Sequence, residues 1–153
     1  MISKNVFRKL LEKGLTIAFA ESMTGGALAF EMIKNPGSSE VIQGSVVAYN
    51  ESVKINLLGI SKNDIERFGV VSEGVASLMS NQIRSLFKSS IGVGVTGNAG
   101  PKCQSENQQK EVWIAISNDH QTKTHHLVFD KETRLQTIRK TVLYTYQKLL
   151  EII

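Results

Sequence analysis

Apolar residues recur along this chain in two periods, and the period predicts which kind of element forms. Over residues 72–87 they return every three or four positions, which is the spacing of one face of a helix. Weaker stripes of the same kind occur elsewhere, and caps or stops accompany several of them. Helices are expected over residues 4–13 and 72–87, after Gly25, after a capping-box-like start at Ser61, and from about residue 131.

Short runs that are apolar or β-branched separate these stripes and predict strands. Residues typical of turns divide the runs from the helices, as at Asn35-Pro36-Gly37. Strands are expected over residues 15–20, 41–49 and 91–95, and a hairpin around Asn118 is expected from residues 112–116 and 124–129.

The order of these elements predicts the fold class. Strands and helices alternate through most of the chain, and a hairpin and a helix finish it. That order favours an α/β fold, a three-layer α/β/α sandwich on a mixed, mostly parallel sheet with a terminal hairpin and helix. The chain has 153 residues and no visible repeat or linker, so we expect a single domain over residues 1–153.

Composition and charge exclude several classes of protein. The sequence is 41% hydrophobic, with one cysteine, Cys103, which cannot form an intramolecular disulfide or a metal framework, so we expect a cytoplasmic protein. It has no cleavable apolar leader and no run near the roughly 18 apolar residues of a membrane helix, so no membrane partner is expected. The net charge of +4 is scattered, which argues against a nucleic-acid partner.

The candidate chemistry begins where the first expected strand ends, in Glu21-Ser22-Met23-Thr24-Gly25-Gly26. Ligands of open α/β sheets bind beyond the carboxyl ends of the strands. Two glycines let a ligand approach the backbone, and free N–H groups at the start of the next helix can bind an anion. Ser22 is therefore a candidate nucleophile. Ser22 and Thr24 as caps of the following helix are an equally open alternative.

A serine nucleophile needs a base, and two residue types offer one. The histidines His120, His125 and His126 all fall in the expected hairpin, where exposed positions without a catalytic role are the ordinary interpretation. Lys54 follows Tyr49, just past another strand end, and burial would lower its pKa enough for it to act as a base. A surface lysine at the start of a helix is the more usual outcome for such a residue.

Four blocks of the sequence, taken in order and spacing, resemble the carboxy-terminal domain of the CinA family. The resemblance covers roughly residues 5 to 150. The blocks are Ala20-Glu21-Ser22-Met23-Thr24-Gly25-Gly26, then Gly44-Ser45-Val46-Val47-Ala48-Tyr49 with Lys54, then Gly69-Val70-Val71-Ser72-Glu73, and then Val95-Thr96-Gly97-Asn98-Ala99-Gly100-Pro101.

The resemblance implies an amidohydrolase that converts nicotinamide mononucleotide into nicotinate mononucleotide and ammonia. It implies a three-layer α/β/α fold, no metal or other cofactor, and a homodimer. The family's functional serine, tyrosine, lysine and threonine fall on Ser22, Tyr49, Lys54 and Thr96.

Roles for these residues follow from the resemblance and from the chemistry of their side chains. Neutral Lys54 would take the Ser22 proton, and Tyr49 would relay a proton or hold the lysine. Backbone N–H groups around Thr24, Gly25 and Gly26 would stabilise an oxyanion. Thr96 and Gly97, with a helix N-terminus, would hold the substrate phosphate.

Two segments depart from the family pattern. Residues 102–111 contain no glycine, where relatives have a glycine-rich segment and a Pro-Val-Gly-Thr block. Near the last helix the expected arginines are displaced, so that Arg134, with Arg139 second, is the candidate phosphate ligand. These departures keep open an alternative, a catalytically silent relative that binds a nucleotide or a partner protein in the same crevice.

Overall fold

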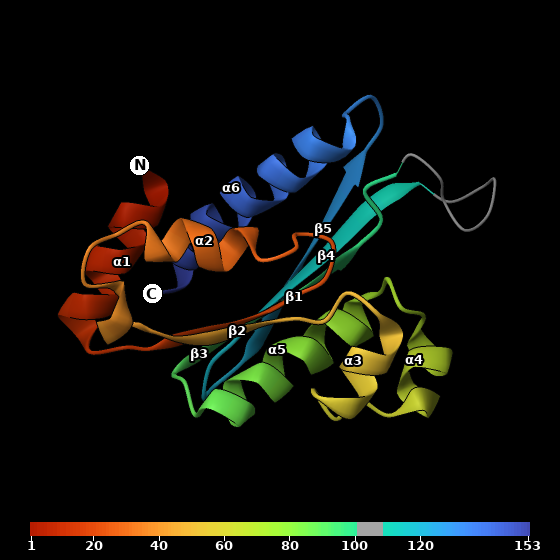
Figure 1. Cartoon of the computed structure of the whole chain (residues 1–153), viewed down its shortest axis with the longest axis horizontal. Helices are drawn as coiled ribbons and strands as arrows, with labels where there is room; N and C mark the ends of the chain where they lie inside the picture. Colours follow the sequence, from red (N-terminus) through yellow and green to blue (C-terminus); the bar gives the residue numbers. More distant parts are fainter. Residues whose placement is uncertain (101–108) are drawn as a thin grey trace.

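The computed structural model describes residues 1–100 and 109–153, and the elements alternate along the chain as the sequence predicts (Figure 1). The structure adds two short elements to the helices and strands that the hydrophobic pattern indicates. One is a helix after Tyr49 that contains Lys54, and the other is a 3-10 turn. The elements are α1 (Ile2–Lys13), β1 (Ile17–Glu21), α2 (Ala27–Ile33), η1 (Ser38–Glu40), β2 (Ile42–Val47), α3 (Glu51–Asn56), α4 (Lys62–Phe68), α5 (Glu73–Phe87), β3 (Ile91–Gly97), β4 (Lys110–Ser117), β5 (Thr122–Phe129) and α6 (Arg134–Ile152).

The five strands of the described residues form one mixed sheet in the order β2-β1-β3-β4-β5. β1 pairs in parallel with both β2 and β3, whereas β3 with β4 and β4 with β5 pair antiparallel. Every strand of this sheet except β4 therefore runs in the same direction. The carboxyl ends of β1, β2 and β3 lie side by side, with Glu21 paired to Val47 and to Val95.

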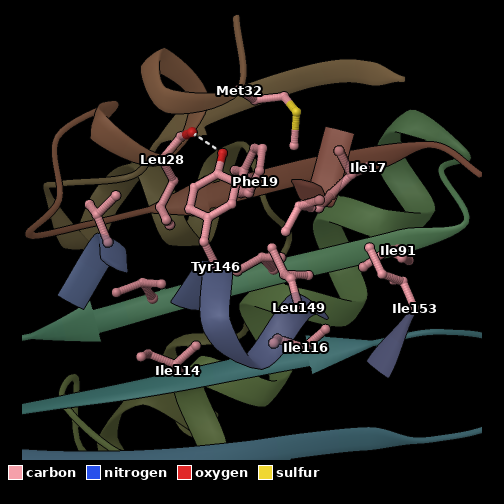
Figure 2. Packing of buried hydrophobic residues seen from close by; sticks show 14 of the residues in the cluster. Ile17, Phe19, Leu28, Met32, Ile91, Ile114, Ile116, Tyr146, Leu149 and Ile153 are labelled. Carbon is pink, nitrogen blue, oxygen red and sulfur yellow. Dashed lines mark hydrogen bonds between the residues drawn. The ribbon is translucent and has the colours of Figure 1, made fainter. Parts of the chain in front are cut away.

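Helices cover both faces of the sheet, which confirms the three-layer α/β/α prediction. α1, α2 and α6 lie on one face, and α3, α4 and α5 lie on the other (Figure 1). β1 is buried along its whole length and supplies side chains to both cores. Phe19 points into the first core with Leu28 and Tyr146, whose hydroxyl donates to the Leu28 carbonyl (2.7 Å; Figure 2).

Small residues on the second face let α5 lie close against the sheet. A Cβ at Gly92 would stand 2.1 Å from the Ser80 carbonyl oxygen, and one at Gly94 would stand 2.4 Å from that of Ala76. Only glycine fits this close approach of helix to strand. Gly92 and Gly94 therefore set how deeply α5 packs against the sheet.

No helix in residues 1–100 and 109–153 combines the length and apolarity needed to cross a membrane.

Candidate functional site

A pocket of about 460 Å³ opens at the carboxyl ends of the parallel strands. Its volume is within the usual range of small-molecule sites in proteins. It brings together the loop after β1, the second residue past the end of β2 (Tyr49) and the end of β3, as the strand order predicts. The loop between α4 and α5, the start of β4 and the first residue of α6 also contribute to it. The described residues that line it are Ser22, Met23, Tyr49, Gly69, Val70, Val71, Thr96, Gly97, Asn98, Ala99, Gly100, Gln109, Glu111 and Arg134.

The turn that carries Ser22 is held from behind by the side chain of Glu21. This carboxylate is fully buried and accepts four hydrogen bonds. Its Oε2 accepts from the N–H groups of Gly26 (3.1 Å) and Leu28 (3.0 Å). Its Oε1 accepts from the Ala29 N–H (2.9 Å) and from the Ser45 hydroxyl (3.2 Å). A negative charge at the N-terminus of a helix is favourable, so Glu21 is the cap of α2.

This arrangement corrects two sequence-based expectations. The N-terminus of α2 does not offer free N–H groups to an anion, because Glu21 already occupies those of Gly26, Leu28 and Ala29. Nor do the hydroxyls of Ser22 and Thr24 cap the helix. Thr24 Oγ1 is buried with no hydrogen-bond partner among the described residues, and Ser22 Oγ contacts Lys54 instead.

The glycines of the turn serve its shape. Gly25 and Gly26 adopt positive φ angles of 59° and 97°, which allow the sharp bend between Ser22 and α2. The Gly25 N–H closes the bend by donating to the Ser22 carbonyl oxygen (3.1 Å). Neither glycine nor Thr24 is among the described residues that line the pocket. These three residues therefore lie behind the serine and not beside a ligand.

Ser22 lines the pocket, and Lys54 lies behind it, outside the described pocket lining. The lysine Nζ lies 3.2 Å from Ser22 Oγ and donates to the Ala48 carbonyl oxygen at 2.6 Å. Lys54 is fully buried in the last turn of α3, which corrects the expectation of a surface lysine. The Asn50 side chain caps that helix by accepting from the Ser52 N–H (2.9 Å), which turns the chain inward directly after Tyr49.

The surroundings of Lys54 favour its neutral form. Burial lowers the pKa of the Lys54 amine, because the ammonium ion loses hydration, and the carboxylate of Glu51 opposes this effect only in part. A neutral amine keeps a lone pair. Lys54 can then donate one N–H to Ala48 and accept the hydroxyl proton of Ser22, which is the arrangement of a general base and its nucleophile.

Tyr49 lies at the mouth of the pocket, away from the lysine. It is 62% exposed, and its hydroxyl accepts from Arg134 Nη2 at 2.9 Å. Arg134 Nη1 donates to the Gly100 carbonyl oxygen at 2.6 Å. No hydrogen bond joins Tyr49 to Lys54 within the described part of the chain, so Ala48 and Ser22 hold the lysine instead. Arg139 is exposed on α6 and is absent from the described pocket lining.

Thr96 and Gly97 form the floor of the pocket at the end of β3. The Thr96 side chain is fully buried, and its hydroxyl donates to the Val70 carbonyl oxygen (2.8 Å). It thereby ties the loop between α4 and α5 to the sheet. A Cβ at Gly97 would stand 2.8 Å from the Glu111 carbonyl oxygen, so this glycine allows β3 and β4 to approach closely.

Glu111 is a pocket residue that the sequence reasoning did not single out. Its Oε2 lies 2.9 Å from Nε2 of His126, and the His126 ring stacks on Trp113 with centroids 4.1 Å apart and planes 7° apart. His126 is exposed, as expected, and it contacts the side chain of a residue that lines the pocket. The sequence does contain one sign of this arrangement: residues two apart on a strand share a face, so β4 places Glu111 and Trp113 on the same side of the sheet.

Most of the segment that departs from the family pattern, including Cys103, lies outside the described residues. Within the described ranges, no group of three or more histidine, cysteine or acidic side chains is placed to hold a metal ion.

Comparison with solved structures supports the architecture. The chain superposes on a competence or damage-inducible protein from Enterobacter asburiae with a TM-score of 0.94 at 26% identity, covering 99% of this chain and 95% of that one. A competence damage-inducible protein from Klebsiella pneumoniae gives a TM-score of 0.94 at 28% identity, with 98% and 93% covered. The α/β fold is therefore shared over nearly the whole of both neighbours.

Comparison with curated sequences identifies the family. A CinA-like protein from Fervidobacterium nodosum is 40% identical over 138 residues, which are 88% of this chain and 33% of that protein. A CinA-like protein from Sulfurihydrogenibium is 39% identical over 128 residues, which are 82% of this chain and 32% of that protein. The chain thus spans about a third of these relatives. Residues 1–153 match the family described as the CinA C-terminal domain. The chain therefore belongs to the CinA family.

Proposed function

We propose that this protein is an amidohydrolase that converts nicotinamide mononucleotide into nicotinate mononucleotide and ammonia, as a step of pyridine-nucleotide recycling in the cytoplasm. One observation carries the chemical half of the proposal. A buried lysine, Lys54, whose pKa is lowered by burial, lies 3.2 Å from the hydroxyl of Ser22 at the base of the pocket. The substrate comes from the family resemblance.

The first step transfers a proton and forms a bond. Ser22 Oγ attacks the carbonyl carbon of the carboxamide while its proton passes to the neutral Nζ of Lys54. Lys54 is positioned for this, because one N–H is taken by the Ala48 carbonyl oxygen (2.6 Å) and Nζ lies within hydrogen-bond distance of Ser22 Oγ. General-base assistance of this kind typically contributes 10²- to 10⁴-fold in rate.

The negative oxygen of the tetrahedral intermediate needs N–H donors. The N–H groups of Met23 and Thr24 have no acceptor among the described residues, whereas those of Gly25 and Gly26 are used within the turn. Met23 follows the nucleophile and lines the pocket. We therefore assign the oxyanion contact to the Met23 N–H, and not to the N–H groups of the two glycines. A donor of this kind is worth about 3–4 kcal/mol.

The remaining steps reuse the same lysine. The Lys54 ammonium returns its proton to the departing nitrogen, so that ammonia leaves and an ester on Ser22 remains. A water molecule then gives a proton to Lys54 and attacks the ester carbon. Collapse of the second intermediate returns the proton from Lys54 to Ser22 Oγ and releases the carboxylic acid, which then ionises. The overall balance is amide plus water to carboxylic acid plus ammonia, with no cofactor.

Arg134 is the side chain suited to the substrate phosphate. Its guanidinium carries five N–H donors, and the hydrogen bonds to Tyr49 and Gly100 leave others for a ligand. Tyr49 is then a positioning residue that steers the guanidinium over the pocket. Thr96 and Gly97 shape the floor between the two ends of the substrate, and the exposed Arg139 is left without a part in binding.

The test is direct. Purified protein is incubated with nicotinamide mononucleotide from about pH 6 to 9, a range chosen around the working pH of a general base, and ammonia is measured. We expect release that rises with pH as Lys54 loses its proton. Saturable binding without any ammonia at any pH would replace the proposal with the silent nucleotide-binding relative.

A further inference from the structure

Glu111 stands out because the proposed reaction makes no use of it. Among the described residues lining the pocket, Glu111 and Arg134 are the two with charged side chains. Arg134 suits an anion, whereas a carboxylate repels one. The wall formed by Glu111 therefore faces a part of the ligand that is not the phosphate.

The carboxylate is held in a definite orientation. His126 Nε2 lies 2.9 Å from Glu111 Oε2, and the His126 ring is itself fixed by its stacking on Trp113. The backbone is fixed as well, since the Glu111 carbonyl oxygen accepts from the Asn98 N–H at 2.8 Å. The side chain is about one third exposed, and no residue of the described chain donates to its Oε1. One carboxylate oxygen is thus oriented and open to a ligand.

An ionised carboxylate accepts hydrogen bonds and cannot donate them. Its ligand partner must carry hydroxyl or N–H groups at a distance from the anionic group that Arg134 takes. The vicinal hydroxyls of a ribose 5′-phosphate meet that description, because they are donors separated from the phosphate by the sugar carbons. We propose that Glu111 accepts hydrogen bonds from the ribose hydroxyls of the substrate and so selects ribonucleotides. This inference rests on the proposed function.

The test separates binding from turnover. In protein carrying Ser22→Ala, titration calorimetry compares nicotinamide mononucleotide with its 2′-deoxyribose analogue. We expect the ribonucleotide to bind about 10- to 100-fold more tightly, since the analogue leaves a desolvated carboxylate without its donor. Adding Glu111→Ala should reduce that preference to about 2-fold or less, mainly by weakening the ribonucleotide.

Two further variants control for indirect effects. Glu73→Gln changes a carboxylate on the same side of the sheet that accepts from the Thr124 hydroxyl (2.6 Å) and lies outside the described pocket lining, so it should keep the full preference. Glu111→Gln keeps the shape of the side chain and should fold even if the alanine variant does not. It should lower the preference at least several-fold, because the acceptor loses its charge.

The outcomes separate the two proposals. An undiminished preference in both Glu111 variants, or an equal loss for the two ligands as expected for an interaction with the pyridinium charge, overturns the inference. If the unmutated protein releases no ammonia while Glu111 still sets the preference, only the amidohydrolase proposal fails. If ammonia is released and Glu111 has no influence on the sugar, only this inference fails. No saturable binding of either ligand overturns both.

Discussion

The two sides of the pocket are held in place by different means. On one side, the turn around Ser22 is tied down by backbone N–H groups and a buried carboxylate, and its partner Lys54 is fully buried. On the other side, Tyr49, Arg134 and Glu111 are at least partly exposed and depend on side-chain hydrogen bonds. Buried groups in fixed positions suit chemistry, which depends on small displacements, whereas exposed side chains suit recognition.

The comparison predicts that substitutions on the buried side act on kcat and those on the exposed side act on KM. Ser22→Ala should have the largest effect. We expect loss of turnover by about 10⁴-fold or more, because the attacking atom is removed. Ammonia release checks the loss. Thermal unfolding should show a folded protein, because Glu21, and not Ser22, holds the turn. Residual turnover near the normal rate would assign the nucleophile elsewhere.

Lys54→Met should lower kcat by about 10²- to 10⁴-fold, since an apolar side chain of similar length removes the base and keeps the packing. Steady-state kinetics with nicotinamide mononucleotide give the split between kcat and KM. A higher KM with an unchanged kcat would place Lys54 among the recognition residues and contradict the division between a buried chemical side and an exposed binding side.

The same variant carries a stability signature. The folded pKa of Lys54 is lowered, so between that pKa and the unfolded value the unfolded chain binds more protons. Stability should therefore rise with pH through this window and fall as pH drops through the folded pKa. Urea unfolding at several pH values should show that this slope is smaller in Lys54→Met than in the unmutated protein.

Arg134→Ala probes the exposed side. Loss of a charged hydrogen-bonding group typically costs about 1.5–3 kcal/mol. We therefore expect KM for the mononucleotide to rise roughly 10- to 100-fold with little change in kcat. Arg139→Ala is a matched control on the same helix and should leave both constants unchanged, because Arg139 is exposed and lies outside the described pocket lining. Similar effects of the two would contradict the phosphate assignment.

Glu21→Gln should act mainly on stability and only modestly on kcat. In the unmutated protein, both carboxylate oxygens of Glu21 accept from backbone N–H groups of the turn and of α2. Glutamine replaces one of these oxygens by an NH₂ group, which cannot accept, so at least one of the N–H groups loses its partner. The free energy of unfolding should fall by about 1–3 kcal/mol. We expect kcat to fall about 10-fold with KM unchanged, because the serine turn loosens and the recognition side does not. A selective rise in KM would count against the separation of the two sides.

The local pattern was enough to find the strands, the longer helices and the serine turn. Periodicity predicted α5 and the mixed sheet, and the strand-glycine-helix pattern marked Ser22. Matching blocks pointed to Lys54 and Thr96. Each of these features is carried by neighbouring residues, whose propensities act over a few positions along the chain.

The burial and the partners of each side chain could not be predicted from local patterns. Lys54 and Ser22 are 32 positions apart, and Tyr49 and Arg134 are 85 apart. Whether they meet depends on strand register and on how α3 and α6 pack, which no local pattern contains. The burial of Lys54 and the place of Glu111 in the pocket wall arise from packing between elements that are distant in sequence. Glu21 caps α2 only five to eight residues away, but only because the turn folds back on the strand that carries it. Sequence patterns indicate which residues can do chemistry, whereas packing sets their hydration, partners and charge.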